Sequence, residues 1–338
     1  MDFSTTRTLF AGILCLGLAC GVADAADVAV KAPPAPMPVF DQLDVHGIFD
    51  LTFANDYITP RGLLVTRTGL TTQALMGLSL DIYKNPGGFI NDISIDFGTW
   101  NDLWSKENDP HVGSWNEFDW WVGTNIKFAQ AWTFGVHYWE FLPPAHDLPT
   151  SFPSTERNIE FALSYDDSWT NWPIIFHPYV KFWDHTSGPS NVVLGERSGT
   201  FDVELGVVPT VDLRKYWGIP VTLTAPTWVT VGPTGFWNRN DGTTNLCGAL
   251  SNQPCSLSNA GVFATGLTGK TPLDFWIPKR LGNWYVKYGF QYYHIINDAL
   301  LAAQELTAGA SGISTVNGTF PQAQRDVFVG FGGIGFTF

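Results

Sequence analysis

Apolar and polar side chains alternate with a period of two in four successive segments near the start of the chain. In 43–53, 72–83, 91–99 and 117–128, one face is mainly aliphatic or aromatic, while the other carries acids, amides and hydroxyls. Successive side chains of a β-strand point to opposite faces, so each segment predicts a strand with one apolar and one polar side. About ten residues is also the length that a tilted strand needs to cross a bilayer.

Eight more segments are interpreted as strands. They are 132–141, 158–165, 174–184, 199–208, 220–231, 261–275, 284–294 and 325–338, which brings the total to twelve. Two of them contain a proline, Pro178 and Pro226, and each proline removes a hydrogen bond from the strand ladder.

The connections between these strands alternate in length. Those after even-numbered strands are mostly short, for example 84–88 and 129–131, whereas those after odd-numbered strands are mostly long, for example 101–115 and 232–260. Short turns on one side and long loops on the other are typical of outer-membrane barrels, whose short turns face the periplasm. We therefore predict an all-β fold, an antiparallel transmembrane β-barrel of about twelve strands with long extracellular loops.

The stretch "VFVGFGGIGFTF" contains a literal G-x-G-x-x-G from Gly330 to Gly335. A dinucleotide site needs a helix after this motif, and the three residues that follow are too few for one turn. The alternation instead predicts a strand that closes the barrel. Its outward face carries Phe336 and Phe338, which resemble the C-terminal signal recognised by the bacterial barrel assembly machinery.

Composition and the N-terminal segment point to export. Aromatic residues make up 15% of the chain and charged residues only 14%, against roughly a quarter charged in soluble proteins. Arg7 precedes an apolar run, and "ADA" at 23–25 predicts cleavage after Ala25, with lipidation at Cys20 as the alternative. We predict a signal peptide at 1–25, an Ala/Pro-rich periplasmic lead-in at 26–42 and a barrel at 43–338 in the bacterial outer membrane.

The net charge limits the kinds of partner that we expect, and the cysteine content predicts a disulfide. The formal net charge is −13 at pH 7, which argues against nucleic acid because its phosphates need basic patches. After cleavage only Cys247 and Cys255 remain, and an even pair in an exported protein predicts a disulfide within the long loop 232–260.

The polar faces of the strands predict the lining of a lumen in which acids outnumber bases. An open lumen of this kind favours cations. The alternative is a plugged structural or adhesive barrel, because large side chains such as Trp121, Trp139, Tyr179 and Trp183 could fill so narrow a space. The predicted pore-lining residues are Asp44, His46, Asp50, Asp81, Asp92, Asp96, Glu117, Asp119, Lys127, His137, Glu160, His177, Lys181, Asp202, Glu204, Lys287 and Gln291.

Residues 49–83 resemble the TorF-like porins, and 95–128 and 261–295 extend the resemblance. The positions that carry it are Asn55, Asp56, Tyr57, Arg61, Gly62, Gln73 and Gly77, while Pro60 departs from an expected aromatic. The resemblance implies an outer-membrane barrel with a pore role and without a cofactor. Its expected partners are outer-membrane lipid, lipopolysaccharide, the barrel assembly machinery and small solutes.

An enzyme was the third possibility, because an outer-membrane phospholipase also has twelve strands. It would need a serine nucleophile and a histidine base. The nearest match is His185 and Ser187, but Gly188 stands where that enzyme has Asn. The histidines form no H-E-x-x-H pattern, so the sequence predicts neither an enzyme nor a metal site.

Overall fold

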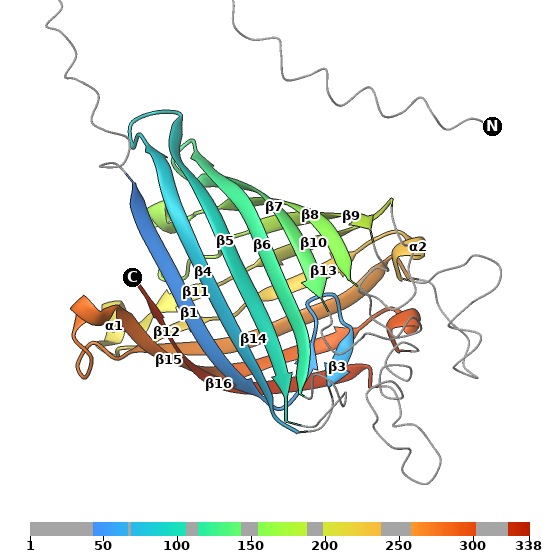
Figure 1. The fold of residues 1–338 in the computed structure, drawn as a ribbon. Coiled ribbons are helices and arrows are strands. Elements are labelled where there is room, and N and C mark those ends of the chain that lie inside the picture. Colours follow the sequence, from blue (N-terminus) through green and yellow to red (C-terminus); the bar gives the residue numbers. More distant parts are fainter. Residues whose placement is uncertain are drawn as a thin grey trace, which may run out of the picture. The chain divides into compact units, whose positions relative to one another are not determined.

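The computed structural model describes residues 43–66, 69–105, 114–142, 155–187, 199–237, 258–301 and 324–338, which form a closed antiparallel β-barrel (Figure 1). The expected signal peptide, the lead-in and the cysteine pair Cys247 and Cys255 lie outside these residues. Those three expectations therefore stay predictions.

The barrel wall is one sheet in which strand segments neighbour one another around the ring. The segments β10 and β11 flank Pro209, and β12 and β13 flank Pro226, so each pair is one interrupted strand and the wall has twelve strands, as predicted. The strand segments are β1 (Asp44–Ala54), β4 (Thr71–Lys84), β5 (Ile90–Trp104), β6 (Trp115–Phe128), β7 (Trp132–Leu142), β8 (Glu156–Tyr165), β9 (Tyr179–Ser187), β10 (Thr200–Val207), β11 (Thr210–Asp212), β12 (Thr222–Thr224), β13 (Thr227–Val231), β14 (Ala260–Pro272), β15 (Asn283–Ile295) and β16 (Asp326–Thr337).

The barrel closes where β1 pairs with β16. Phe49 lies opposite Phe336, and the backbone of Gly47 exchanges two hydrogen bonds of 3.1 Å with Phe338. The Phe336 ring stacks on Trp284 at 4.7 Å, and Phe338 is 57% exposed. The predicted closing strand is confirmed, with its terminal aromatics on the outer face.

The strand predicted at 174–184 begins only at Tyr179. Pro178 has no N–H to donate, and His177 before it has a left-handed φ of 44°. The Asp167 carboxylate accepts hydrogen bonds from the backbone N–H groups of Phe176 and His177 at 2.9 Å. His177 therefore lies just outside the strand, and its place in the lumen lining stays a prediction.

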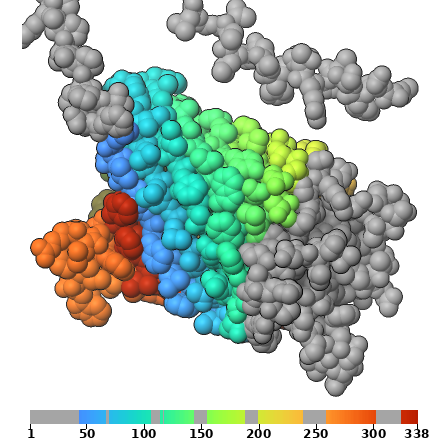
Figure 2. Space-filling view, in the orientation of Figure 1, coloured from blue at the N-terminus to red at the C-terminus, as the bar shows by residue number. Residues whose placement is uncertain are grey.

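The outer face of the barrel is apolar. Figure 2 shows the part of this face that β1, β4, β5 and β6 form side by side. Such a surface is unfavourable in water but matches the hydrocarbon around an outer-membrane barrel, so the barrel lies in the bacterial outer membrane. Residues of this face with more than a third of their surface exposed include Met76, Leu78, Ile95, Phe97, Val122, Phe134, Phe161, Leu205, Phe263 and Phe290.

Helices are few and short among the described residues. Those with both ends described are α1 (Leu213–Trp217) and α2 (Thr234–Trp237), with the 3-10 turns η2 (Ser168–Thr170) and η3 (Lys279–Leu281), and residues 298–301 are also helical. Within the described ranges, no helix has the length and apolar character needed to cross a membrane.

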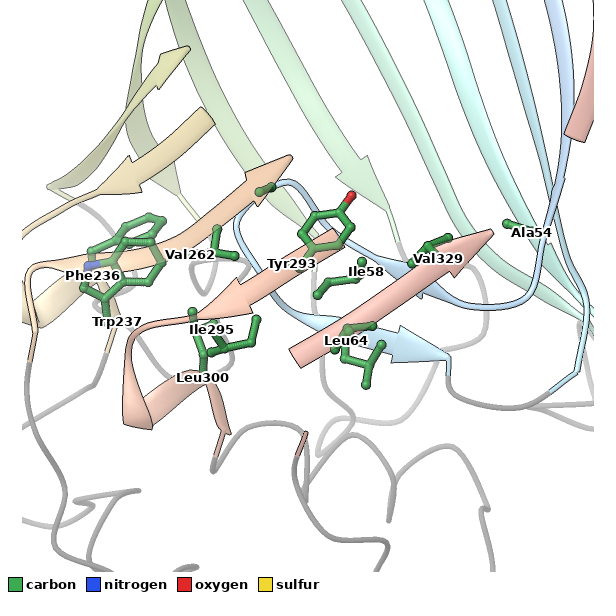
Figure 3. Packing of buried hydrophobic residues seen from close by; sticks show 12 residues of the cluster. Ala54, Ile58, Leu64, Phe236, Trp237, Val262, Tyr293, Ile295, Leu300 and Val329 are labelled. Carbon is green, nitrogen blue, oxygen red and sulfur yellow. The ribbon is translucent and has the colours of Figure 1, made fainter. Parts of the chain in front are cut away.

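The predicted long connection at 54–71 folds inward. It contains a hairpin of β2 (Tyr57–Ile58) and β3 (Leu64–Thr66), here called the lumen hairpin. Ile58 and Leu64 of this hairpin belong to a buried apolar cluster at the loop end of the barrel (Figure 3). The other members are Ala54, Phe236, Trp237, Val262, Ala264, Tyr293, Ile295, Leu300, Val327 and Val329.

This cluster changes the picture of the lumen drawn from the sequence. The polar strand faces predicted a polar lumen lining, yet at the loop end the inner faces of β14, β15 and β16 present Val262, Ile295 and Val327. They are apolar there because the lumen hairpin, rather than water, covers them.

Candidate functional site in the barrel lumen

The tip of the lumen hairpin places Arg61 in the middle of the lumen. A tight turn brings the Gly62 N–H to the Thr59 carbonyl at 2.8 Å, and Gly62 has a φ of +91°, a conformation that suits glycine. The Pro60 carbonyl accepts hydrogen bonds from Trp228 Nε1 at 3.1 Å and from the Thr230 hydroxyl at 3.4 Å. The tip is thereby fixed to β13.

Arg61 is 5% exposed and binds two buried carboxylates of the barrel wall. Its Nη1 lies 2.9 Å from Glu156 Oε1 on β8, and its Nε lies 3.1 Å from Asp202 Oδ1 on β10. The guanidinium carbon lies 4.9 Å from the centre of the Trp183 ring. Burial alone would lower the pKa of Arg61, but the charges of Asp202 and Glu156 raise it above its usual range, so the guanidinium stays charged.

Two cavities lie in the lumen. The first, of about 430 Å³, lies against the lumen hairpin and is here called the loop-side chamber. The second, of about 540 Å³, is lined by His46, Ser79 and Asp96 and is called the turn-side chamber. Trp121 lines both chambers, stacks on Trp139 at 4.7 Å and donates its Nε1 hydrogen to Asp96 at 3.0 Å. The indole of Trp121 therefore stands where the two chambers meet.

Most of the predicted lumen acids have partners of opposite charge. One network runs across β5, β7, β8 and β9: His137 Nε2 lies 3.2 Å from Asp96, and its Nδ1 lies 3.2 Å from Glu160. Lys181 lies 3.5 Å from the other oxygen of Glu160. Because these groups are buried together, each charge offsets the desolvation of its neighbour.

Two smaller groups complete the networks, one of them on the β1 side of the barrel. Asp50 is buried, pairs with Lys287 and accepts a hydrogen bond of 2.8 Å from the Tyr285 hydroxyl. Glu204, on the other side, accepts a hydrogen bond of 2.7 Å from the Tyr179 hydroxyl.

A cluster at the turn end has the residue types of a metal site. Asp44, His46 and Asp81 place one ligand atom each within 4.8 Å of one another. The Lys84 ammonium, however, lies 2.9 Å from Asp44 and 2.8 Å from Asp81. It supplies the positive charge that a metal ion would otherwise bring.

Glu117 and Asp119 are two of the four predicted lumen acids that no ion pair among the described residues includes, the others being Asp92 and Glu204. Glu117 shares hydrogen bonds with the Tyr57 hydroxyl and with Asp119, and two carboxyl groups joined by a hydrogen bond hold one proton between them. Asp119 is 7% exposed, and its Oδ1 has no hydrogen-bond partner among the described residues. Both side chains line the loop-side chamber.

The remaining predicted residues lie on the wall away from the main networks. Asp92 and Lys127 face each other across β5 and β6. Gln291 is 8% exposed on β15, and its Nε2 has no hydrogen-bond partner.

The sequence pattern did not predict Glu156, Tyr285 and Lys84 as lumen residues. Arg61 was named only as a position of the family resemblance, not as part of the lumen. Glu156 precedes the strand predicted at 158–165, and Arg61 lies in a predicted loop. The signal that could have found Arg61 is that it directly precedes Gly62 in a connection between two strongly alternating strands.

The residues considered for hydrolysis have separate partners. His185 is buried, and its Nδ1 lies 3.1 Å from Asn158 Oδ1 and 3.3 Å from Glu156 Oε1. The Ser187 hydroxyl accepts a hydrogen bond of 3.4 Å from Arg157. The His185 ring and the Ser187 hydroxyl therefore contact different residues of the barrel wall.

Comparisons with known proteins give a likeness of fold at low identity. No protein-family model matches the chain. No curated protein matches it either. An outer-membrane channel from Pseudomonas putida F1 is 11% identical, with a TM-score of 0.47 over 87% of this chain and 94% of that one. OprB of Pseudomonas putida is 10% identical, with a TM-score of 0.40 over 89% and 95%.

The translocator domain of the autotransporter NalP from Neisseria meningitidis is also similar. It is 10% identical, with a TM-score of 0.33 over 89% of this chain and 92% of that domain. Scores at this level carry no function across to this chain, and the resemblance to the TorF-like porins stays a prediction.

Proposed function

We propose that the protein is a porin-like channel of the outer membrane through which small cationic or neutral solutes diffuse passively. The observation that carries the proposal is the loop-side chamber, which Glu117 and Asp119 line without an ion pair to any described residue. Carboxylates in a narrow passage of low dielectric raise the local concentration of cations more than acids on a salt-screened surface.

The lumen hairpin acts as the constriction of this channel. It is held from β13 through Pro60 and from β8 and β10 through Arg61. In this channel a solute passes through the loop-side chamber, along the wall that includes Gln73, Leu75 and Trp100.

The hairpin also favours a second candidate, the plugged structural or adhesive barrel. Ile58 and Leu64 are 5% and 2% exposed, so the hairpin packs like part of a protein core. In such a barrel the lumen would carry no current, and the long loops would bind the partner.

Planar-bilayer recording of the purified full-length protein separates the two. A channel gives discrete current steps, and in a salt gradient its reversal potential shows cation preference. The matched variant replaces residues 57–66 by a short Gly/Ser linker, which should enlarge the steps because it removes the constriction. Silence of the wild type, in a preparation whose heat-modifiable gel migration shows folded barrel, would decide for the plugged barrel.

A further inference from the structure

The wall of the loop-side chamber around Asp119 is aromatic. Asp119 pairs directly with Trp100 on β5 and with Phe141 on β7, and directly opposed side chains have Cβ atoms about 4.5–5.5 Å apart. The carboxylate of Asp119 is therefore flanked on both sides by aromatic rings.

Further along the barrel wall, the lining of the chamber is again aromatic. Trp121 stacks on Trp139 at 4.7 Å, and Trp139 lies 5.7 Å from Trp183. Tyr57 of the lumen hairpin packs on Trp100, with the two ring centres 5.1 Å apart. All five rings line the chamber.

The positive charges already in the chamber have their own carboxylates. Arg61 is matched by Glu156 and Asp202, and Lys181 by Glu160. Asp119 nevertheless keeps a buried oxygen without a hydrogen bond. A buried carboxylate needs a partner, and the open side of this one faces the chamber.

The chemistry of the wall selects the kind of cation. Calcium and magnesium ions require six or more oxygen ligands, whereas this wall offers two carboxylates and many rings. Alkylammonium and quaternary ammonium groups bind the faces of aromatic rings and need few hydrogen-bond acceptors. Arg61 illustrates the same arrangement, because its guanidinium sits between two carboxylates and the Trp183 ring.

We propose that the loop-side chamber binds a small organic cation, with its charge against the one negative charge that Asp119 and Glu117 share and its alkyl groups against the tryptophan wall. A cavity of about 430 Å³ is large enough for such a ligand. The proposal deepens the proposed channel function by naming its solute class. It rests on that function for transport, while binding itself needs only the chamber.

The test uses choline and its neutral isostere 3,3-dimethylbutan-1-ol, which has the same shape without the charge. Tryptophan fluorescence of the purified full-length protein in detergent, at constant ionic strength, reports binding. We expect choline to bind at least about tenfold more tightly than the alcohol. Equal affinities, or no binding of choline, would overturn the proposal without any variant.

Variants then locate the site. Asp119→Asn and, separately, Glu117→Gln should weaken choline binding by about tenfold. Asp274→Asn makes the same change of charge in an exposed turn and should leave binding unchanged. Choline affinity that survives in both folded lumen variants would also overturn the proposal.

Bilayer recording of the same samples separates this inference from the channel itself. Choline added to one side should reduce the current of the wild type and reduce it less in the Asp119→Asn variant. Current without choline binding or block would sink only the organic-cation site. Choline binding to a barrel that passes no current would leave the site standing and reject the channel.

Discussion

Two stretches of the same barrel wall use their inner faces in opposite ways. At the loop end of β14 to β16, the inner side chains are apolar and pack on the lumen hairpin, and this stretch is here called the clamping wall. On β5 to β8, the inner side chains are carboxylates and tryptophans that face a cavity, and this stretch is called the acidic wall. Their outer faces are alike, since both meet lipid.

The difference teaches that lipid fixes the outer face of every strand, while the inner face depends on what lies across the lumen. The clamping wall is apolar because a segment of the chain covers it, and the acidic wall is polar where it lines the loop-side chamber. Arg61 joins the two, since it leaves the hairpin and reaches Glu156 and Asp202.

The largest expected effect comes from removing the contacts of Arg61 that connect the hairpin to Glu156 and Asp202. Arg61→Ala should destabilise the barrel by about 3–5 kcal/mol, because it leaves two buried carboxylates without their counterion. It should also make the bilayer current larger or noisier, because the hairpin tip is released. Denaturant titration and single-channel recording measure the two effects.

The matched control is Arg157→Ala. Arg157 also pairs with a carboxylate, Glu140 at 2.9 Å, but its side chain is 46% exposed. We expect a change of about 1 kcal/mol or less. If both arginine variants behaved alike, the join between the walls would have no energetic importance.

A smaller effect should follow from weakening the clamping wall itself. Leu64→Ala removes a side chain that is 2% exposed and should destabilise by about 2–4 kcal/mol through the cavity it leaves. Leu78→Ala on the outer face, where Leu78 is 49% exposed, should change stability less. The same denaturant titration checks both, and an unchanged midpoint for Leu64→Ala would mean that the hairpin does not pack as described.

The acidic wall should respond in selectivity rather than stability. The double change Glu117→Gln and Asp119→Asn should lower cation preference by about fivefold, because it removes the negative charge that draws cations into the chamber, an effect of about 1 kcal/mol. Reversal potentials in a salt gradient measure it. Asp96 is best left intact, because it holds Trp121, Asn125 and His137. An unchanged reversal potential would remove these two acids from the conduction path.

The smallest effect concerns the turn at 166–178, outside both walls. Burial alone would raise the pKa of Asp167, but hydrogen bonds from the backbone N–H groups of His177 and Phe176 lower it. Its contribution to stability is therefore present above the unfolded pKa, near 3.9, and is lost as the pH falls through the lower folded pKa.

Hydrogen exchange checks this turn. Asp167→Asn should speed the exchange of the Phe176 and His177 amides at neutral pH and change overall stability by about 1 kcal/mol. Protection that persists unchanged in the variant would mean that the carboxylate does not order the turn.

The sequence predicted the wall well because each strand is a local pattern. Alternation located all twelve strands, and Phe336 and Phe338 marked the closing one. Alternation also placed Asp96, Glu160 and Asp202 on the inner face. It could not show which inner groups meet, because Arg61 and its partner Glu156 are 95 positions apart.

The errors have local causes. The predicted strand 174–184 starts too early, because the apolar residues at 174–176 continue the strand pattern while Pro178 interrupts the ladder. Before Tyr179 this segment keeps one isolated antiparallel bridge, between Ile175 and Thr210. The lumen hairpin was taken as an ordinary loop, because nothing in 55–70 alone shows that its apolar residues face a barrel interior. Ile58 and Leu64 gain that meaning only from the strands they contact.

The seam between Gly47 and Phe338 has a consequence for the order of assembly. Among the described strands, every other pairing joins segments that follow one another along the chain, so each can form as a local hairpin. The seam alone must wait until the two ends of the sheet meet, which makes it the slow, high-contact-order step. Until then β1 and β16 present bare edges that could pair with another chain. The time during which this protein is prone to aggregate is therefore set by one strand pair, and variants of the seam should change the yield of folded barrel more than its final stability.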